Sequence, residues 1–98
     1  MRFQFANSDL EDLYYEEKGK EAYPDYVVTA FFKRMQTIKS AKNENDLRAI
    51  KGNHFEKMEG ENNKYSIRLN QQYRLIFSLE NDGVCKIMLI KEISNHYS

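Results

Sequence analysis

Two arginines, Arg68 and Arg74, are the residues whose type and spacing most directly suggest chemistry. They flank a short polar loop between two stretches in which every second residue is apolar. Both apolar sets can be buried together only if Leu69 faces Tyr73 across a three-residue loop. This register places Arg68 opposite Arg74. Because facing like charges are unfavourable by about 0.2–1 kcal/mol, an anion such as phosphate between the two guanidinium groups would explain the pair.

Such a pair could stabilise a phosphoryl transition state, since a guanidinium fork matches phosphate oxygens and keeps its proton. The alternative is two solvated arginines on an open sheet face. His96 and Tyr97 follow the last apolar strand. An imidazole can act as general acid or base, and a phenol can stack on a base or donate a proton. The alternative for both is a frayed chain end.

Four further basic residues are candidates for contacts with backbone phosphates of a nucleic acid: Lys51, Lys57, Lys86 and His54. Each alone is weak evidence, because surface lysines usually only solubilise and His54 fits a structural or solvated role. The sequence contains no phosphate-binding glycine loop, no two-histidine metal spacing and no serine-nucleophile elbow. We therefore expect neither a metal nor a cofactor.

Composition predicts one domain, residues 1–98, without disulfide bonds, because Cys85 is the only cysteine. No signal peptide and no membrane-spanning apolar run is present, so the sequence predicts a cytoplasmic protein. The formal net charge is zero, but residues 48–98 carry eight basic and six acidic side chains. Binding of nucleic acid by bulk charge is thereby excluded, and any such role must rest on a local patch.

The N-terminal half favours a strand over residues 1–6, a helix over 9–18, a second helix over 24–41 and a helical turn over 45–50. Ser8 and Glu11 have the spacing of a capping box, and Gly19 is expected to stop the first helix. Pro24 fits the first turn of the second helix, and Gly52 is expected to close the helical turn. The apolar stripe of the second helix is Val28, Phe31, Phe32, Met35 and Ile38.

The C-terminal half predicts four strands, over residues 54–59, 64–69, 73–80 and 84–93. Extending the alternation across a turn at 81–83 places three residues of the last strand in the core: Cys85, Ile87 and Leu89. The opposite face then carries the two arginines with Ser66, Ser78 and Lys86 nearby, and three apolar residues a partner could cover: Ile76, Met88 and Ile90. The predicted fold class is α+β, with an N-terminal strand and two helices packed on an antiparallel sheet.

Several segments together resemble the HigB branch of the RelE/ParE toxin superfamily, the toxins of type II toxin–antitoxin pairs. The matching segments are Leu47-Arg48, Gly52-Asn53, Phe55-Glu56-Lys57-Met58 with Gly60, Tyr65-Ser66-Ile67-Arg68, Gln72-Tyr73-Arg74-Leu75-Ile76-Phe77 and Ile93-Ser94-Asn95-His96-Tyr97. Their order and spacing cover the C-terminal half, whereas the N-terminal half agrees only in its pattern of elements.

The resemblance implies a RelE-like microbial RNase fold and a ribosome-dependent mRNA endonuclease that needs no metal. It implies that Arg68 and Arg74 bind the scissile phosphate, that His96 assists proton transfer and that Tyr97 orients the nucleotide. The expected partners are the ribosome, mRNA and a helix-turn-helix HigA-like antitoxin, with a toxin–antitoxin heterotetramer as one assembly. Two alternatives remain open: a gyrase inhibitor of the ParE type, and an inactive homologue that only binds its antitoxin.

Overall fold

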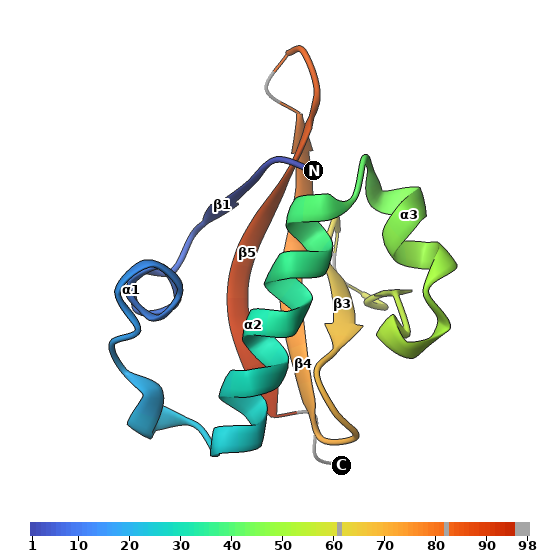
Figure 1. Ribbon diagram of the computed structural model, residues 1–98. Coiled ribbons are helices and arrows are strands. Elements are labelled where there is room, and N and C mark those ends of the chain that lie inside the picture. The colour runs from blue at the N-terminus through green and yellow to red at the C-terminus, as the bar shows by residue number, and fades with distance from the viewer. Residues whose placement is uncertain (61, 82, 96–98) are drawn as a thin grey trace.

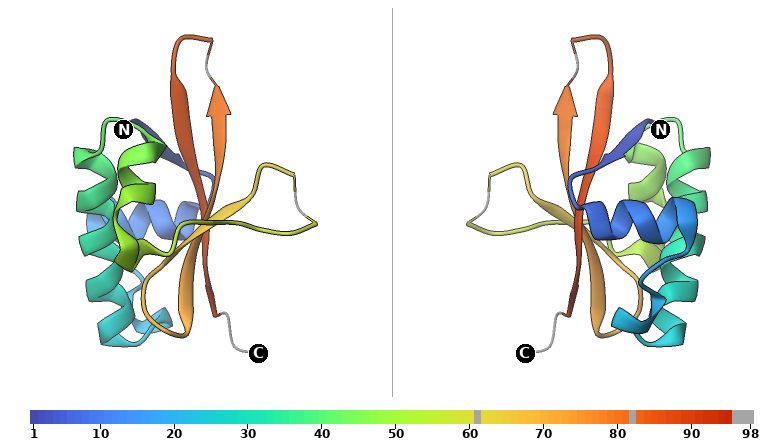
Figure 2. Two further views of the ribbon diagram at one scale, coloured as in Figure 1. Left: turned by 90° about the vertical axis from the view of Figure 1, so that its right-hand side faces the viewer. Right: turned by 90° about the vertical axis from the view of Figure 1, so that its left-hand side faces the viewer.

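A computed structural model describes residues 1–60, 62–81 and 83–95 of the chain. Five strands form one sheet in the order β1-β5-β4-β3-β2, and the helices cover one of its faces (Figures 1 and 2). This arrangement confirms the predicted α+β class. The elements are β1 Phe3–Phe5, α1 Ser8–Glu16, η1 Lys20–Ala22, α2 Asp25–Ser40, α3 Glu44–Ala49, η2 Lys51–Asn53, β2 Glu56–Lys57, β3 Tyr65–Arg68, β4 Tyr73–Asn81 and β5 Lys86–Asn95.

The first helix, α1, begins one residue earlier than the capping-box pattern indicated. Asn7 is the N-cap, and its Oδ1 accepts hydrogen bonds from the backbone N–H groups of Asp9 and Leu10 at 2.8 and 3.4 Å. The prediction that Ser8 caps this helix is therefore wrong. The helix also ends before Gly19, because Glu17 already adopts the left-handed conformation, with φ 55°. An asparagine cap satisfies the same orphan amides as a serine would.

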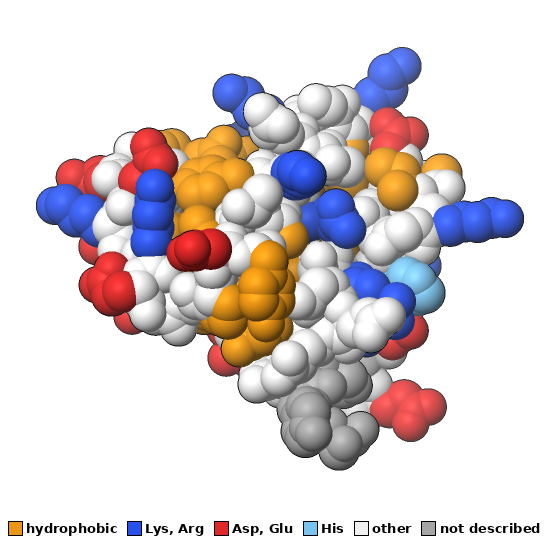
Figure 3. Space-filling model, turned by 60° about the horizontal axis from the view of Figure 1, so that its bottom comes forward, with side chains coloured by type: hydrophobic (Ala, Val, Ile, Leu, Met, Phe, Trp, Pro, Cys, Tyr) orange, Lys and Arg blue, Asp and Glu red, His pale blue; other side chains and the backbone are white. Residues whose placement is uncertain are grey.

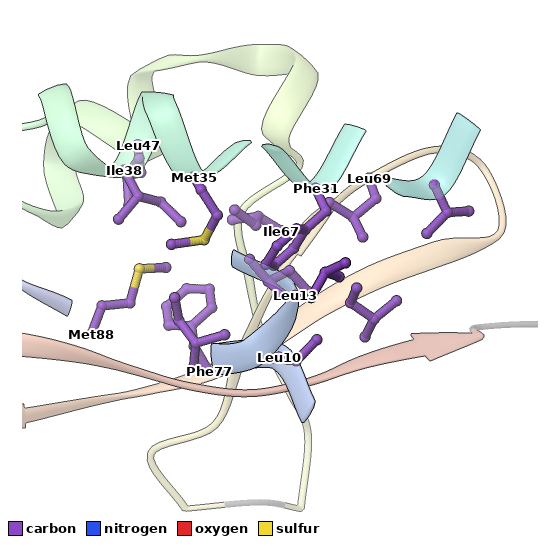
Figure 4. Packing of buried hydrophobic residues seen from close by; sticks show 14 of the residues in the cluster. Leu10, Leu13, Phe31, Met35, Ile38, Leu47, Ile67, Leu69, Phe77 and Met88 are labelled. Atoms are coloured by element: carbon purple, nitrogen blue, oxygen red, sulfur yellow. The ribbon is translucent and has the colours of Figure 1, made fainter. Parts of the chain in front are cut away.

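The second helix, α2, starts directly after Pro24 and ends at Ser40, in agreement with the predicted span. It buries four of the five predicted stripe residues together with Val27, whereas Phe32 is only half-buried. Figure 4 shows the resulting core between the helices and the sheet. Its fully buried members include Leu10, Leu13, Phe31, Met35, Ile38, Leu47, Ile67, Phe77 and Met88. The following helix α3 is capped by Asn43 and ends before Ile50, so Gly52 does not close it.

The hairpin formed by β3 and β4 has the predicted register. Arg68 pairs with Arg74, and the backbone N–H of Leu69 donates to the carbonyl of Tyr73 at 2.9 Å. Asn70 shapes the loop, since its Oδ1 accepts from the backbone N–H of Tyr73 at 2.6 Å. Strand β2 is shorter than expected, and only two of its residues pair with β3.

The pairing of β4 with β5 contradicts the predicted faces of β5. Ile76 pairs with Glu92 but Phe77 pairs with Ile90, so the register shifts by one residue between them. Met88 and Ile90 are consequently fully buried in the core. A β-bulge exchanges the two faces of the strand in this way. The prediction that Met88 and Ile90 face away from the helices is therefore wrong.

The same shift places the other predicted residues of β5 elsewhere. Ile87 pairs with Glu80 and Leu89 pairs with Ser78, so both lie on the face away from the helices. Ile87 is nevertheless buried there, with 7% of the residue exposed. Cys85 precedes β5, in the connection from β4, and is only partly buried rather than part of the core. The connection also lies later in the sequence than the predicted turn at 81–83, because β4 extends to Asn81 and β5 begins at Lys86.

Strand β1 lies at an edge of the sheet and pairs with β5 in parallel, with Phe3 beside Met88 and Phe5 beside Ile90. The other three strand pairs are antiparallel, so the sheet is mixed. Among the described residues, no helix is long and apolar enough to cross a membrane.

Candidate active site

The sheet face away from the helices brings the two arginines together. We call this surface the arginine face. Residues paired across neighbouring strands share a face, so Arg68, Arg74 and Ser94 form one row across β3, β4 and β5. Glu56 belongs to the neighbouring row on the same face, because it pairs with Ser66. The same row continues through Ile76 to Glu92, so the strand register places two carboxylates next to the row of the two arginines.

Arg74 is half-buried at the start of β4. Its Nη1 donates to the backbone carbonyl of Asn70 at 2.9 Å, which anchors the guanidinium against the loop. Partial burial lowers the pKa of Arg74, the nearby charge of Arg68 lowers it further, and the carboxylate of Glu56 opposes both effects. An arginine remains protonated at neutral pH even so. The charge of Arg74 is therefore held where a bound anion would stabilise it.

Arg68 ends β3 and is held in place by its backbone. Nε of Arg34, on α2, donates to the carbonyl of Arg68 at 2.8 Å. Nε of Arg68 is buried and has no hydrogen-bond partner among the described residues. A buried donor without a partner costs about 1–3 kcal/mol. Because this Nε is not accessible to solvent, a bound anion would have to contact Arg68 through the outer nitrogens of its guanidinium group.

A cleft of about 590 Å³ lies on the arginine face beside Arg74. The strands that form its wall project away from the helices, as Figure 2 shows for the segment from β2 to β3. Its lining combines two carboxylates, two cations, a hydroxyl and two apolar side chains: Glu56, Lys57, Met58, Glu59, Ser66, Arg74 and Ile76. Such a cleft offers charge stabilisation and proton transfer at one place.

The remaining predicted RNA-contacting residues differ in whether they line this cleft. Lys57 is part of its lining, whereas Lys51 and His54 are exposed at the two ends of the η2 turn and do not line it. His54 has a left-handed backbone, with φ 44°. Figure 3 shows Lys, Arg and His side chains gathered from the centre to the right of that view.

Lys86 is not part of the arginine face. Its Nζ donates to Oε1 of Glu44, on α3, at 2.5 Å. The pairing of Lys86 with Asn81 places it on the side of the sheet that the helices cover. The predicted position of Lys86 near the two arginines is therefore wrong, and the β4–β5 register shift is the reason.

His96 and Tyr97 lie outside the described residues. Strand β5 is described as far as Asn95, and its last pairs are Ser94 with Arg74 and Asn95 with Tyr73. The described part of β5 therefore ends one residue beyond the row of the two arginines, which contains Ser94.

Two residues that support the site were not predicted from the sequence, Asn70 and Arg34. Asn70 had a local signal, because an asparagine at the first position of a short loop commonly accepts hydrogen bonds from backbone amides two or three residues later. Arg34 had none, since its contact with Arg68 joins residues 34 positions apart. In the described part of the chain, no group of three or more His, Cys, Asp or Glu residues could hold a metal ion.

Comparison with known proteins gives consistent matches over nearly the whole chain. A family model described as a RelE-like toxin of the type II toxin–antitoxin system HigB matches residues 3–91. Toxin HigB-1 of Vibrio cholerae serotype O1 is 39% identical over 85 residues, which are 86% of this chain and 88% of that protein. An uncharacterised protein of Haemophilus influenzae is 35% identical over 89 residues, 90% of this chain and 88% of its own.

Among solved structures, a YoeB/ParE toxin from Agrobacterium tumefaciens has a similar fold. Its TM-score is 0.57, and the superposition covers 99% of this chain and 100% of that one. The sequence identity is 12%, so this likeness concerns the fold alone.

Proposed function

The chain belongs to the HigB-like family of RelE-like toxins from type II toxin–antitoxin systems, and we propose that it cleaves mRNA on the ribosome as a metal-independent endoribonuclease. The observation that carries this proposal is the pairing of Arg68 with Arg74 across β3 and β4. One phosphate bound between the two guanidinium groups would relieve their charge repulsion. Cleavage of mRNA would inhibit translation.

The reaction follows from what these groups can do. A general base removes the proton of the ribose 2′-hydroxyl, and the 2′-oxygen attacks the neighbouring phosphorus. The bond to the 5′-oxygen then breaks, and a general acid protonates that oxygen as it leaves. Arg68 and Arg74 stabilise the additional negative charge of the pentavalent transition state. The products are a 2′,3′-cyclic phosphate and a free 5′-hydroxyl, and no metal takes part.

Four residues are candidates for proton transfer and nucleotide orientation. His96 is our first choice for the acid or base, and Tyr97 would orient the nucleotide. Glu56 is a further candidate base, because it lines the cleft beside Arg74 and its charge acts on that guanidinium. His54, exposed on the η2 turn, is the next candidate if His96 has no role.

The surrounding cations would contact the RNA backbone. Lys57 is the best placed, because it lines the same cleft as Arg74. Lys51 and His54 would contact more distant phosphates of mRNA or ribosomal RNA. Lys86 takes no part in this proposal, because Glu44 on α3 binds its ammonium group.

Membership of the family implies an antitoxin partner in a type II system. We propose that this antitoxin is a helix-turn-helix protein of the HigA type and that the two proteins form a heterotetramer. Co-expression with the product of the adjacent reading frame, followed by analytical ultracentrifugation, tests this assignment. A toxin that sediments alone beside that product would contradict it.

Cleavage of a reporter mRNA in a translating extract tests the enzymatic proposal. We expect wild-type protein to cut ribosome-bound mRNA even when a metal chelator is added, at a chelator concentration that leaves the ribosome intact. The variants His96→Ala and Glu56→Gln should cut more slowly than wild type. A supercoiling assay with gyrase serves as the comparison. Inhibition of gyrase without cleavage of mRNA would refute the proposal, and the absence of both activities in a chain that still binds its antitoxin would identify an inactive homologue.

A further inference from the structure

A second surface with binding character lies on the helical side of the molecule, away from the arginine face. A groove of about 1010 Å³, which we call the helix groove, is bounded by α1 and α2. It is lined by Tyr14, Tyr15, Thr29, Phe32, Lys33, Gln36, Lys39 and Ser40. The proposed RNA cleavage uses none of these residues.

The floor of the helix groove is aromatic. Tyr14 lies at its centre, and its ring contacts five other rings at centroid distances from 4.8 to 6.5 Å: Phe3, Phe5, Tyr15, Phe31 and Phe32. The ring of Tyr15 is the exposed edge of this cluster, with 64% of the residue accessible to solvent. An exposed tyrosine beside partly buried aromatic rings is typical of a protein-binding surface.

The charge of the helix groove is of one sign. Its two charged lining residues, Lys33 and Lys39, are both cationic, and neither forms an ion pair with a described residue. They are six positions apart on α2, which separates them by roughly 9 Å along the helix axis. A ligand of this groove should therefore combine apolar side chains with carboxylates.

We propose that the helix groove is the docking site of the antitoxin, which binds it through an acidic amphipathic segment. Apolar side chains of that segment would cover Tyr14, Tyr15 and Phe32, while its carboxylates pair with Lys33 and Lys39. This inference rests on the proposed function only in taking the partner to be the antitoxin of a type II pair. The sheet face is less suited, because Ile76 and Ile87 are already at least 93% buried there.

RNA fits the helix groove less well than a protein segment. Stacking of bases requires aromatic rings with an open face. The ring of Tyr14 is surrounded by its neighbours, and Phe32 stacks on Tyr14 with an interplanar angle of 22°. Only Tyr15 remains as an exposed ring of this groove. One ring does not make a stacking platform for successive bases.

The test is the affinity of purified toxin variants for the helix-turn-helix protein encoded beside the toxin, measured by isothermal titration calorimetry. We expect Tyr15→Ala and the double variant Lys33→Glu/Lys39→Glu each to weaken binding by roughly tenfold or more. Wild-type affinity should fall with added salt, and the double variant should lose most of that dependence. Tyr26→Ala is the matched aromatic control, because Tyr26 is 57% exposed and lies outside the groove.

Lys42→Glu is the matched charge control, since Lys42 is exposed and does not line the helix groove. Both controls should bind the antitoxin within about twofold of wild type. Circular dichroism should show that all variants are folded, because the substituted side chains are exposed.

Three results would overturn the proposal. The first is that wild-type toxin fails to bind the helix-turn-helix protein, and the second is that the groove variants bind it as tightly as the controls do. The third result is a set of groove variants that still bind the antitoxin but lose ribosome binding or self-association. Cleavage of mRNA by the free variants separates this proposal from the proposed function. Groove variants should cut mRNA at the wild-type rate. If wild-type toxin cuts no mRNA but its antitoxin affinity depends on the groove, only the enzymatic proposal fails.

Discussion

Replacement of Arg74 by alanine should remove activity without removing the fold. The substitution deletes the hydrogen bond from Nη1 to the carbonyl of Asn70, worth about 0.5–1.5 kcal/mol. It also relieves the repulsion with Arg68 across the strands, worth about 0.2–1 kcal/mol. The two effects oppose each other, so the free energy of unfolding should change by less than about 1.5 kcal/mol. The cleavage rate should fall by roughly 10²–10³-fold, because a donor to the transition-state charge is lost.

Single-turnover cleavage of ribosome-bound mRNA and urea unfolding, measured on the same preparations, check both parts. Arg74→Lys should be intermediate in rate, because it keeps the charge but not the planar fork that binds two phosphate oxygens. Arg2→Ala is the matched control, since Arg2 is an exposed arginine outside the cleft and should leave the rate unchanged. A fully active Arg74→Ala variant would remove this residue from the site. Lost activity together with lost stability would show that Arg74 acts through the fold.

Three further predictions concern stability. The ammonium of Lys86 holds the pKa of Glu44 below its usual value, so this pair stabilises the fold at pH values above the pKa of the unfolded carboxyl group. The stabilisation is lost as the pH falls through the lowered pKa of the folded state. The Tm of Glu44→Gln should therefore decrease less on acidification than that of wild type, and an equal decrease would contradict this. Asn7→Ala should cost about 1 kcal/mol in urea unfolding, whereas Asn7→Ser should cost little. Met88→Ala should cost about 2–5 kcal/mol and Leu89→Ala clearly less; equal losses would argue against the observed register.

Local patterns were sufficient where an element is defined by its own sequence. The periodicity of three and four residues located α2, because that helix buries one stripe regardless of what covers it. The alternation on both sides of one short loop fixed the pairing of Arg68 with Arg74, since any other register would expose an apolar set. The roles of His96 and Tyr97 remain predictions.

The first helix shows a limit of local patterns. Asn7 and Ser8 are adjacent, and both residue types cap helices well. Which of them takes the cap depends on where the chain leaves β1 and turns toward its place on the sheet. The capping-box spacing could not decide between them, because it does not include that geometry.

The sequence by itself determined the α+β class, the span of α2 and the arginine pair. Only the tertiary structure decided which side of β5 enters the core, because the alternation of that strand fits either face until the register shift between Ile76 and Phe77 is known. A bulge leaves one residue of the strand unpaired, and the apolar pattern of the sequence does not show where it occurs. The parallel pairing of β1 and the contact from Arg34 to Arg68 were likewise decided by packing between distant segments, which short-range periodicity does not record.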